Sequence, residues 1–192
     1  MAKLEFTYGT MGSSKTALAL MRRFDLIEGG FNVLLLKPSV DSRDGVITIK
    51  SRIGIEANAK TYEKSDSLIL KFLDDILDCD VIIIDEAQFS TKEQIIELKK
   101  IAEEFDKPVY AYGLRTDFKM NFFEGSEYLF KFADVINGLS KTCECGNEAI
   151  INARYDDNGI IYEGEQVVLG SNDKYKALCY NCFKKGRLNG RN

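Results

Sequence analysis

Residues 9–16 are the segment that most constrains this chain, because they read Gly-Thr-Met-Gly-Ser-Ser-Lys-Thr between an alternating apolar segment and an apolar-periodic one. This order of strand, glycine-containing loop and helix turns backbone N–H groups toward a bound anion. In such a loop we expect Lys15 to meet the outer phosphates and Thr16 to offer its hydroxyl to a magnesium ion. The sequence therefore predicts a P-loop that binds a nucleoside triphosphate.

Ser14 departs from the usual P-loop pattern, because it stands where that pattern has its second glycine. A serine has a steric cost wherever the turn requires a positive φ. The alternative interpretation is an ordinary strand-to-helix turn with a solvated lysine. The predicted phosphate-binding residues of the loop are Gly9, Thr10, Met11, Gly12, Ser13, Ser14, Lys15 and Thr16.

Length and composition favour a globular chain of one domain with one small appendage. The 192 residues are 45% apolar, and the net charge of -4 disfavours a surface built to bind nucleic acid. The longest apolar run, at residues 81–84, is too short to cross a bilayer, so no membrane partner is expected. No secretory signal opens the sequence, which favours the cytoplasm. Histidine is absent, so acid–base chemistry must fall to carboxylates, lysines or tyrosines.

Predicted strands and helices alternate along the first 139 residues, as in an α/β protein with a parallel sheet and helices on both faces. A capping box, Ser90-Thr-Lys-Glu93, is expected to begin the helix that runs to about residue 105. The other expected helices cover residues 15–28, 66–77 and 125–132. The expected strands cover residues 32–37, 46–49, 81–84, 109–113 and 135–139, after the first strand that leads into the loop.

Asp85 and Glu86 follow the buried strand predicted at residues 81–84. Ligands of open parallel sheets bind beyond the carboxyl ends of the strands, where the P-loop also lies. We therefore expect Asp85 to help hold magnesium and Glu86 to orient or deprotonate an attacking hydroxyl. The alternative is that both carboxylates are solvated turn residues.

Cysteine spacing sets the end of the chain apart from the rest. Two close pairs of thiols suggest one tetrahedral zinc site, formed by Cys143, Cys145, Cys179 and Cys182. The first pair is one residue tighter than a C-x-x-C pair, which predicts strained geometry, and a redox dithiol or free thiols are the alternatives. Cys79 is interpreted as a buried apolar residue. We accordingly predict a P-loop domain at residues 1–140 and a zinc-ribbon domain at residues 141–192.

Three further motifs carry a resemblance to a known family. Residues 85–89 read Asp-Glu-Ala-Gln-Phe, residues 113–118 read Gly-Leu-Arg-Thr-Asp-Phe, and residues 173–175 read Asp-Lys-Tyr. Together with the P-loop and the cysteine pairs, they resemble the type II thymidine kinases in order over nearly the whole chain. The resemblance implies transfer of the γ-phosphoryl group of Mg-ATP to the 5′-hydroxyl of thymidine, giving dTMP for pyrimidine salvage. It also implies a structural zinc ion, inhibition by dTTP and a homotetramer.

The resemblance also implies roles for individual residues. Asp41, Arg43 and Gln88 would lie beside the triphosphate, and residues 157–173 would fold over the nucleoside as a lasso. The implied nucleoside-binding residues are Met11, Phe89, Leu114, Phe118, Phe123, Gln166, Val168, Gly170 and Tyr175, with backbone groups near Gln166, Val168 and Gly170 contacting the base. Without the resemblance, the apolar members would be interpreted as core residues and the lasso as a hairpin between the cysteine pairs.

Several departures from the family pattern leave two other functions open. Gly12 stands where an aromatic residue is common, and Arg115 stands where an acidic one is. One alternative is a zinc-ribbon ATPase coupled to a macromolecular partner, in which Glu86 would activate water. The other is a degenerate binder of nucleotides or nucleosides without catalysis, for which Ser14 is the best support. The lasso and aromatic pocket favour the kinase.

Overall fold

The computed structural model describes residues 1–39, 47–167 and 175–189. A sheet of six parallel strands forms the larger body, with the strand order β5-β2-β6-β7-β1-β8. Its strands are β1 (Leu4–Gly9), β2 (Val33–Pro38), β5 (Lys60–Tyr62), β6 (Val81–Ile84), β7 (Val109–Leu114) and β8 (Val135–Leu139). Because the strands are parallel, their carboxyl ends share one edge, as the sequence predicts.

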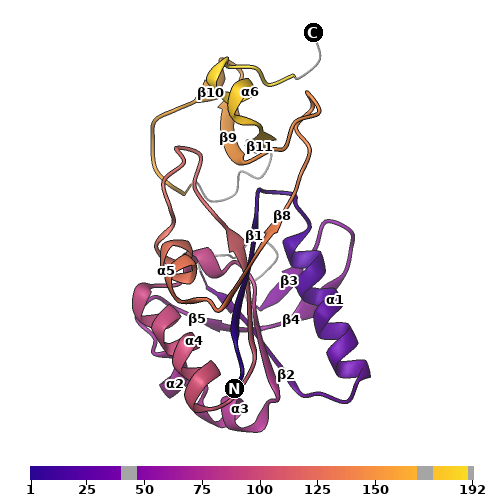
Figure 1. The fold of residues 1–192 in the computed structure, drawn as a ribbon, viewed down its shortest axis with the longest axis vertical. Helices are drawn as coiled ribbons and strands as arrows, with labels where there is room; N and C mark the ends of the chain where they lie inside the picture. The colour runs from indigo at the N-terminus through magenta and orange to yellow at the C-terminus, as the bar shows by residue number, and fades with distance from the viewer. Residues whose placement is uncertain (40–46, 168–174, 190–192) are drawn as a thin grey trace.

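Helices cover both faces of this sheet, with α1 on one side and α2 to α5 on the other (Figure 1). The α-helices are α1 (Lys15–Glu28), α2 (Leu68–Lys71), α3 (Leu73–Asp78), α4 (Lys92–Glu104) and α5 (Glu124–Phe132). A 3-10 turn, η1 (Ala87–Phe89), follows β6, and a two-stranded ribbon pairs β3 (Thr48–Lys50) with β4 (Glu56–Asn58). The parallel α/β fold expected from the sequence is confirmed.

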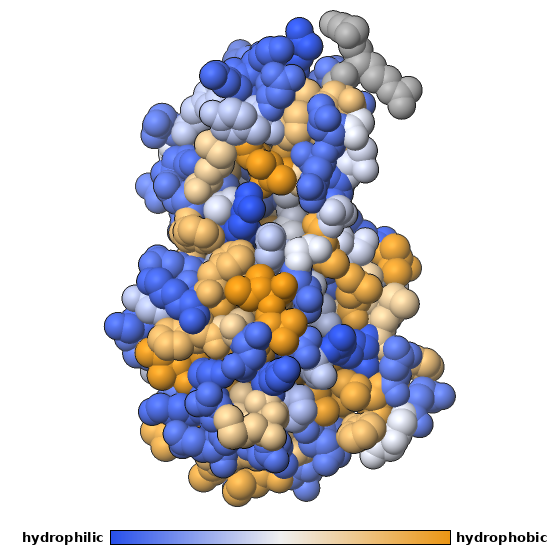
Figure 2. All heavy atoms as spheres, viewed as in Figure 1, coloured by the Kyte–Doolittle hydropathy of each residue, from blue (hydrophilic) through white to orange (hydrophobic). Residues whose placement is uncertain are grey.

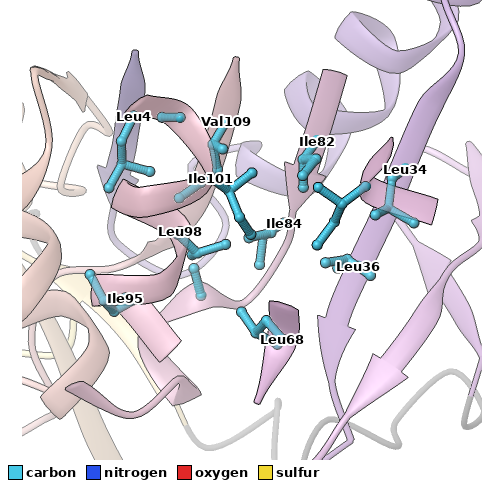
Figure 3. Close-up of a cluster of buried hydrophobic side chains, with 14 of the residues drawn as sticks. Leu4, Leu34, Leu36, Leu68, Ile82, Ile84, Ile95, Leu98, Ile101 and Val109 are labelled. Carbon is cyan, nitrogen blue, oxygen red and sulfur yellow. The ribbon is translucent and has the colours of Figure 1, made fainter. Parts of the chain in front are cut away.

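Strand β6 connects the two halves of the core. Ile82 and Ile84 pack into the cluster under α4, which Figure 3 shows with Ile95, Leu98 and Ile101 around them, whereas Val81 and Ile83 pack on the face that α1 covers. All the residues of β6 are buried. Each buried isoleucine contributes about 1.5–3 kcal/mol, so this apolar run explains why β6 lies inside the sheet rather than at its edge.

Two helix predictions were wrong in detail. The helix expected at residues 66–77 is divided at Phe72, whose φ of -119° separates α2 from α3. The capping box is formed by Thr91 and Gln94 rather than by Ser90 and Glu93. The Ser90 hydroxyl instead forms a hydrogen bond with the hydroxyl of Tyr62 at 2.7 Å. The buried tyrosine hydroxyl needs such a partner, so Ser90 serves the core and not the helix cap.

Helix α1 has the predicted bounds, and small residues make up much of its buried face. Its buried residues include Ala17, Ala19 and Leu20, while Met21 and Phe24 are 49% and 62% exposed. Ala19 and Leu20 pack into the core cluster on this face of the sheet, whereas Met21 and Phe24 face outward. No helix in the described ranges is long and apolar enough to cross a membrane.

A smaller antiparallel sheet stands above the carboxyl edge of the large one (Figure 1). It consists of β9 (Ile151–Asp156), β10 (Gly159–Ile161) and β11 (Tyr175–Leu178), in the order β10-β9-β11, and α6 (Tyr180–Lys184) follows. Its core contains the cysteines together with Ile151, Leu178 and Phe183. The molecule narrows between the two sheets (Figure 2), so the candidate site lies where the carboxyl edge meets the upper part.

Candidate active site

The loop after β1 has the backbone form of a P-loop despite its serine. Ser14 has a φ of 66° and Gly12 a φ of 72°, both in the left-handed region. A non-glycine residue in that region costs roughly 1–2 kcal/mol. The departure at Ser14 therefore strains the turn without removing it.

The Lys15 ammonium turns back into this loop. Its Nζ donates to the carbonyl oxygens of Thr10 at 2.8 Å and Gly9 at 3.3 Å, and lies 3.4 Å from Ser13 Oγ. The side chain is only 7% exposed. A cation in a nearly dry loop attracts an anion strongly, since charge is poorly screened there. A solvated lysine, the alternative interpretation, does not describe this residue.

Asp85 reaches the beginning of α1, so the P-loop and the end of β6 meet as the sequence predicts. The Thr16 hydroxyl donates to its carboxylate, and the side chain is buried. Burial, together with the charge of Glu86, raises the pKa of Asp85 to about 7. A buried carboxylate beside a hydroxyl is a suitable pair of ligands for a divalent cation, which would remove this penalty on its negative charge.

Glu86 is held in an uncommon backbone conformation at the start of η1. Its φ is 53°, and its Oε2 accepts a hydrogen bond from Gln88 Nε2. The oxygen of the same amide, Gln88 Oε1, accepts a hydrogen bond from the backbone N–H of Leu114 at 3.0 Å. A strained backbone maintained by a side-chain network is typical of functional positions. The network fixes the Glu86 carboxylate close to Asp85.

Close packing holds η1 in position from two sides. A Cβ on Gly113 would lie 2.8 Å from Gln88 Oε1, and a Cβ on Gly125 would lie 2.4 Å from the Ala87 carbonyl. These glycines therefore allow β7 and α5 to approach the turn that carries Glu86. This packing is a tertiary property that residue spacing alone does not reveal.

The predicted nucleoside-binding residues divide into two groups. Phe89 and Phe123 come together with ring centroids 5.7 Å apart, beside half-buried Leu114. Phe118 is 1% exposed and lies under Arg154, whose guanidinium is 3.9 Å from the ring centroid. Phe118 is therefore buried, with a cation against its ring.

The segment predicted as a lasso contacts the body through side chains. Gln166 Nε2 donates to Asp117 Oδ2 at 3.0 Å. Arg154 donates to the carbonyl oxygens of Glu163 and Glu165. Tyr175 pairs with Arg154 across β11 and β9. Asp41, Arg43, Val168 and Gly170 lie outside the described residues.

Sequence reasoning missed Asn152, which joins the two sheets. Its Oδ1 accepts the backbone N–H of Met11 at 2.7 Å, and its Nδ2 donates to the Thr116 carbonyl at 3.1 Å. Asn152 is buried in β9 between apolar neighbours. A polar residue in a buried strand requires such partners, so the pattern Ile-Asn-Ala-Arg at 151–154 is the signal that could have identified it.

Two further cations lie beside the P-loop. Lys141 Nζ donates to the Met11 carbonyl at 3.2 Å. Arg52, from the turn between β3 and β4, is near enough that its charge, together with burial, lowers the pKa of Lys141. Burial is the larger of these two effects. Neither residue belongs to the predicted phosphate-binding set.

The four C-terminal cysteines converge. All of their sulfur atoms lie within 4.8 Å of one another, and Cys145 Sγ is 3.5 Å from Cys179 Sγ. A hydrogen bond from the Asn147 backbone, followed by contacts with the neighbouring thiols, lowers the pKa of Cys145 to about 6. Tetrahedral zinc with Zn–S bonds of about 2.3 Å needs sulfurs about 3.8 Å apart, so the cluster fits that ion. The short spacing between Cys143 and Cys145 therefore does not prevent both sulfurs from joining the cluster.

The fold and this geometry define a class first: the chain is a P-loop nucleotide-binding protein with a cysteine cluster suited to zinc. Comparison with known proteins then gives the family. Residues 2–183 match the family described as "Thymidine kinase". The chain belongs to the thymidine kinase family and is thus a deoxynucleoside kinase.

Individual relatives match over nearly their whole lengths. The chain is 40% identical to a thymidine kinase of Rhodopirellula baltica, covering 96% of this chain and 89% of the relative. It is 40% identical to that of Coxiella burnetii, covering 97% of each chain. Among solved structures, the replication initiator DnaA bound to AMPPCP and single-stranded DNA is 14% identical, with a TM-score of 0.44 over 76% of this chain and 42% of that one. That likeness is too low to carry an argument.

Proposed function

We propose that this kinase transfers the γ-phosphoryl group of ATP to the 5′-hydroxyl of thymidine, producing dTMP for pyrimidine salvage. The observation that carries the proposal is the contact between Thr16 and Asp85, which joins the P-loop to the strand end that bears Glu86. A phosphate donor at the P-loop and a hydroxyl acceptor at Glu86 would then lie side by side. Phosphoryl transfer depends mainly on such positioning and on charge stabilisation.

In the proposed reaction, Lys15 and the backbone N–H groups of residues 9–16 bind the phosphates. Lys15 would exchange its present carbonyl partners for phosphate oxygens, a stronger charge-assisted interaction. Glu86 takes the proton of the 5′-hydroxyl, and Gln88 holds its carboxylate in place. Thr16 and Asp85 would hold magnesium, which supplies charge neutralisation at the phosphates when bound.

The nucleoside would lie between the aromatic pair and the segment that ends at Gln166. Phe89 and Phe123 provide an apolar edge for the base. The contact of Gln166 with Asp117 holds this part of the proposed lasso against the body. The proposal also includes recognition of the base by backbone groups at Val168 and Gly170. It further includes contacts with the triphosphate from Asp41, Arg43 and Gln88.

The remaining features of the proposal follow from the family and from the surface. The four cysteines hold a structural zinc ion, and residues 141–192 form a domain separate from residues 1–140. dTTP acts as a feedback inhibitor. The chain forms a homotetramer, and the exposed apolar residues Met21, Phe24 and Phe31 are candidates for its interfaces. Light scattering of the purified chain tests the assembly.

The deciding experiment measures ADP formation from Mg-ATP without an acceptor and with thymidine, deoxyuridine, deoxycytidine or deoxyadenosine. Thymidine-dependent ADP formation, with dTMP appearing in equal amount, is the expected result. ADP formation that does not respond to nucleosides would replace the proposal with a coupled ATPase. Binding of ATP without any ADP formation would replace it with a non-catalytic nucleotide binder.

A further inference from the structure

Two cations from distant parts of the chain converge beside Gly12. A Cβ built on Gly12 would lie 2.4 Å from Lys141 Nζ and 3.5 Å from Arg52 Nη1. Lys141 comes from the segment after β8, and Arg52 from the turn between β3 and β4. Any side chain at position 12 would compete with the Lys141 ammonium for this space. The absence of a side chain at Gly12 therefore allows the ammonium to lie there.

Neither cation is paired with a carboxylate among the described residues. In residues 1–39, 47–167 and 175–189, neither Lys141 nor Arg52 forms an ion pair with a carboxylate; the nearest pair along the chain joins Lys50 to Glu56. Lys141 is partly buried, and its recorded hydrogen bond goes to a neutral carbonyl, that of Met11. Two like charges held together without a counter-charge raise the free energy of the empty site, and an anion between them would lower it.

The position of these charges indicates which anion they would meet. The Met11 carbonyl that Lys141 contacts belongs to the P-loop itself, and the neighbouring Met11 N–H is fixed by Asn152. Lys141 is therefore attached to the same loop that surrounds the proposed phosphates. A polyphosphate carries several negative charges in a row, so it can contact Lys15, Lys141 and Arg52 at the same time.

We propose that Lys141 and Arg52 bind the polyphosphate of the donor nucleotide, in addition to Lys15, so that the segment leading into the cysteine cluster completes the phosphate site. This inference rests on the proposed binding of a nucleoside triphosphate by residues 9–16. It adds two residues to the site that the P-loop motif does not contain. It also explains the glycine at position 12, because a side chain there would displace the Lys141 ammonium.

Binding measured by calorimetry, without turnover, tests the proposal. The titrants are ATP, ADP and AMP with Mg²⁺, and inorganic triphosphate. The Lys141→Met and Arg52→Gln variants should each bind ATP and triphosphate about tenfold more weakly, the usual effect of losing a hydrogen bond to a charged group, and AMP within about twofold of normal. Lys141→Arg should restore most of the ATP affinity.

Lys100→Met is the matched control, because Lys100 is exposed on α4 and its loss changes the net charge equally. It should leave every affinity unchanged. Thermal unfolding of each variant checks that the fold is intact. Equal loss of affinity for AMP and ATP in Lys141→Met, or no loss at all, would overturn the inference and leave Lys141 as a support for the Met11 backbone. Failure of the unaltered chain to bind any of the titrants would instead overturn the proposed function.

Discussion

Ser14 occupies the backbone conformation that glycine adopts at little cost. Its φ of 66° carries a penalty that its hydroxyl does not offset, since it makes no capping hydrogen bond to α1. Ser14→Gly should therefore raise the free energy of unfolding by about 0.5–1 kcal/mol, the relieved strain being partly cancelled by the greater freedom of glycine in the unfolded chain. Chemical denaturation measures the change. Ser14→Val, which cannot relieve the strain, should destabilise the protein, and greater stability of the valine variant would contradict this account.

The raised pKa of Asp85 makes stability depend on pH in a defined direction. Its folded pKa is about 7 against 3.8 for an unperturbed group, so between these values the folded state binds more protons than the unfolded state. Stability should therefore fall as pH rises from about 4 to about 7 and stay lower above it. Asp85→Asn, which cannot ionise, should be more stable than the unaltered protein at pH 8 without magnesium, by a few kcal/mol at most.

Thermal unfolding of both proteins at pH 4.5 and pH 8 is the measurement, with EDTA present. The stabilisation should be small at the lower pH, and turnover of Asp85→Asn should be severely reduced. A variant that gains equal stability at both pH values would show that ionisation of Asp85 is not the cause.

Glu86 is expected to act on the acceptor and not on the nucleotide. Glu86→Gln should lower kcat by about 100-fold or more, because general base catalysis typically contributes 100- to 10,000-fold. The dissociation constant of ATP should change little. Steady-state kinetics and calorimetry measure the two quantities separately. Turnover close to normal in this variant would remove Glu86 from the proposed base role.

Helix α5 and the turn η1 form one packed element behind the site. Gly125 faces the carbonyl oxygens of Ala87, Gln88 and Ser90 at distances that leave no room for a Cβ. Gly125→Ala should destabilise the protein by about 1–3 kcal/mol, as overpacking usually does, and should displace the turn that follows Glu86. A lower thermal midpoint together with a lower kcat is the expected result. Glu127→Ala, an exposed change on the same helix, is the control.

At the scale of elements, the sequence predicted long periodic segments well and their ends less well. Helix α1 and strands β6 and β8 agree with the prediction because their apolar patterns and flanking residues point to one structure. Contacts with residues distant in the sequence occur beside two helix ends that differ from the prediction: Tyr62 bonds Ser90 before the cap at Thr91, and Glu97 accepts from the Leu68 N–H at the start of α2. Local propensity does not contain those contacts.

At the scale of the molecule, Asn152 and Lys141 couple the cysteine cluster to the P-loop. Asn152 lies in β9, which packs with the cysteines, and contacts Met11. Cys182→Ser, or removal of zinc by a strong chelator, should lower the thermal midpoint and weaken ATP binding, because the small sheet would no longer hold the loop. Zinc content by mass spectrometry, with one ion per unaltered chain, accompanies the calorimetry. Full ATP affinity in a zinc-free folded protein would show that the two parts are independent.

The sequence by itself determined the P-loop, the strand that ends at Asp85, the four cysteines and the parallel α/β arrangement, because each follows from local spacing or periodicity. The tertiary structure alone decided which residues meet: Thr16 with Asp85, Met11 with Asn152 and Lys141, and Phe118 with Arg154. These contacts join residues up to 141 positions apart in the chain. Their free energy comes from burial and from satisfied polar groups, and both exist only after distant parts of the chain have packed together.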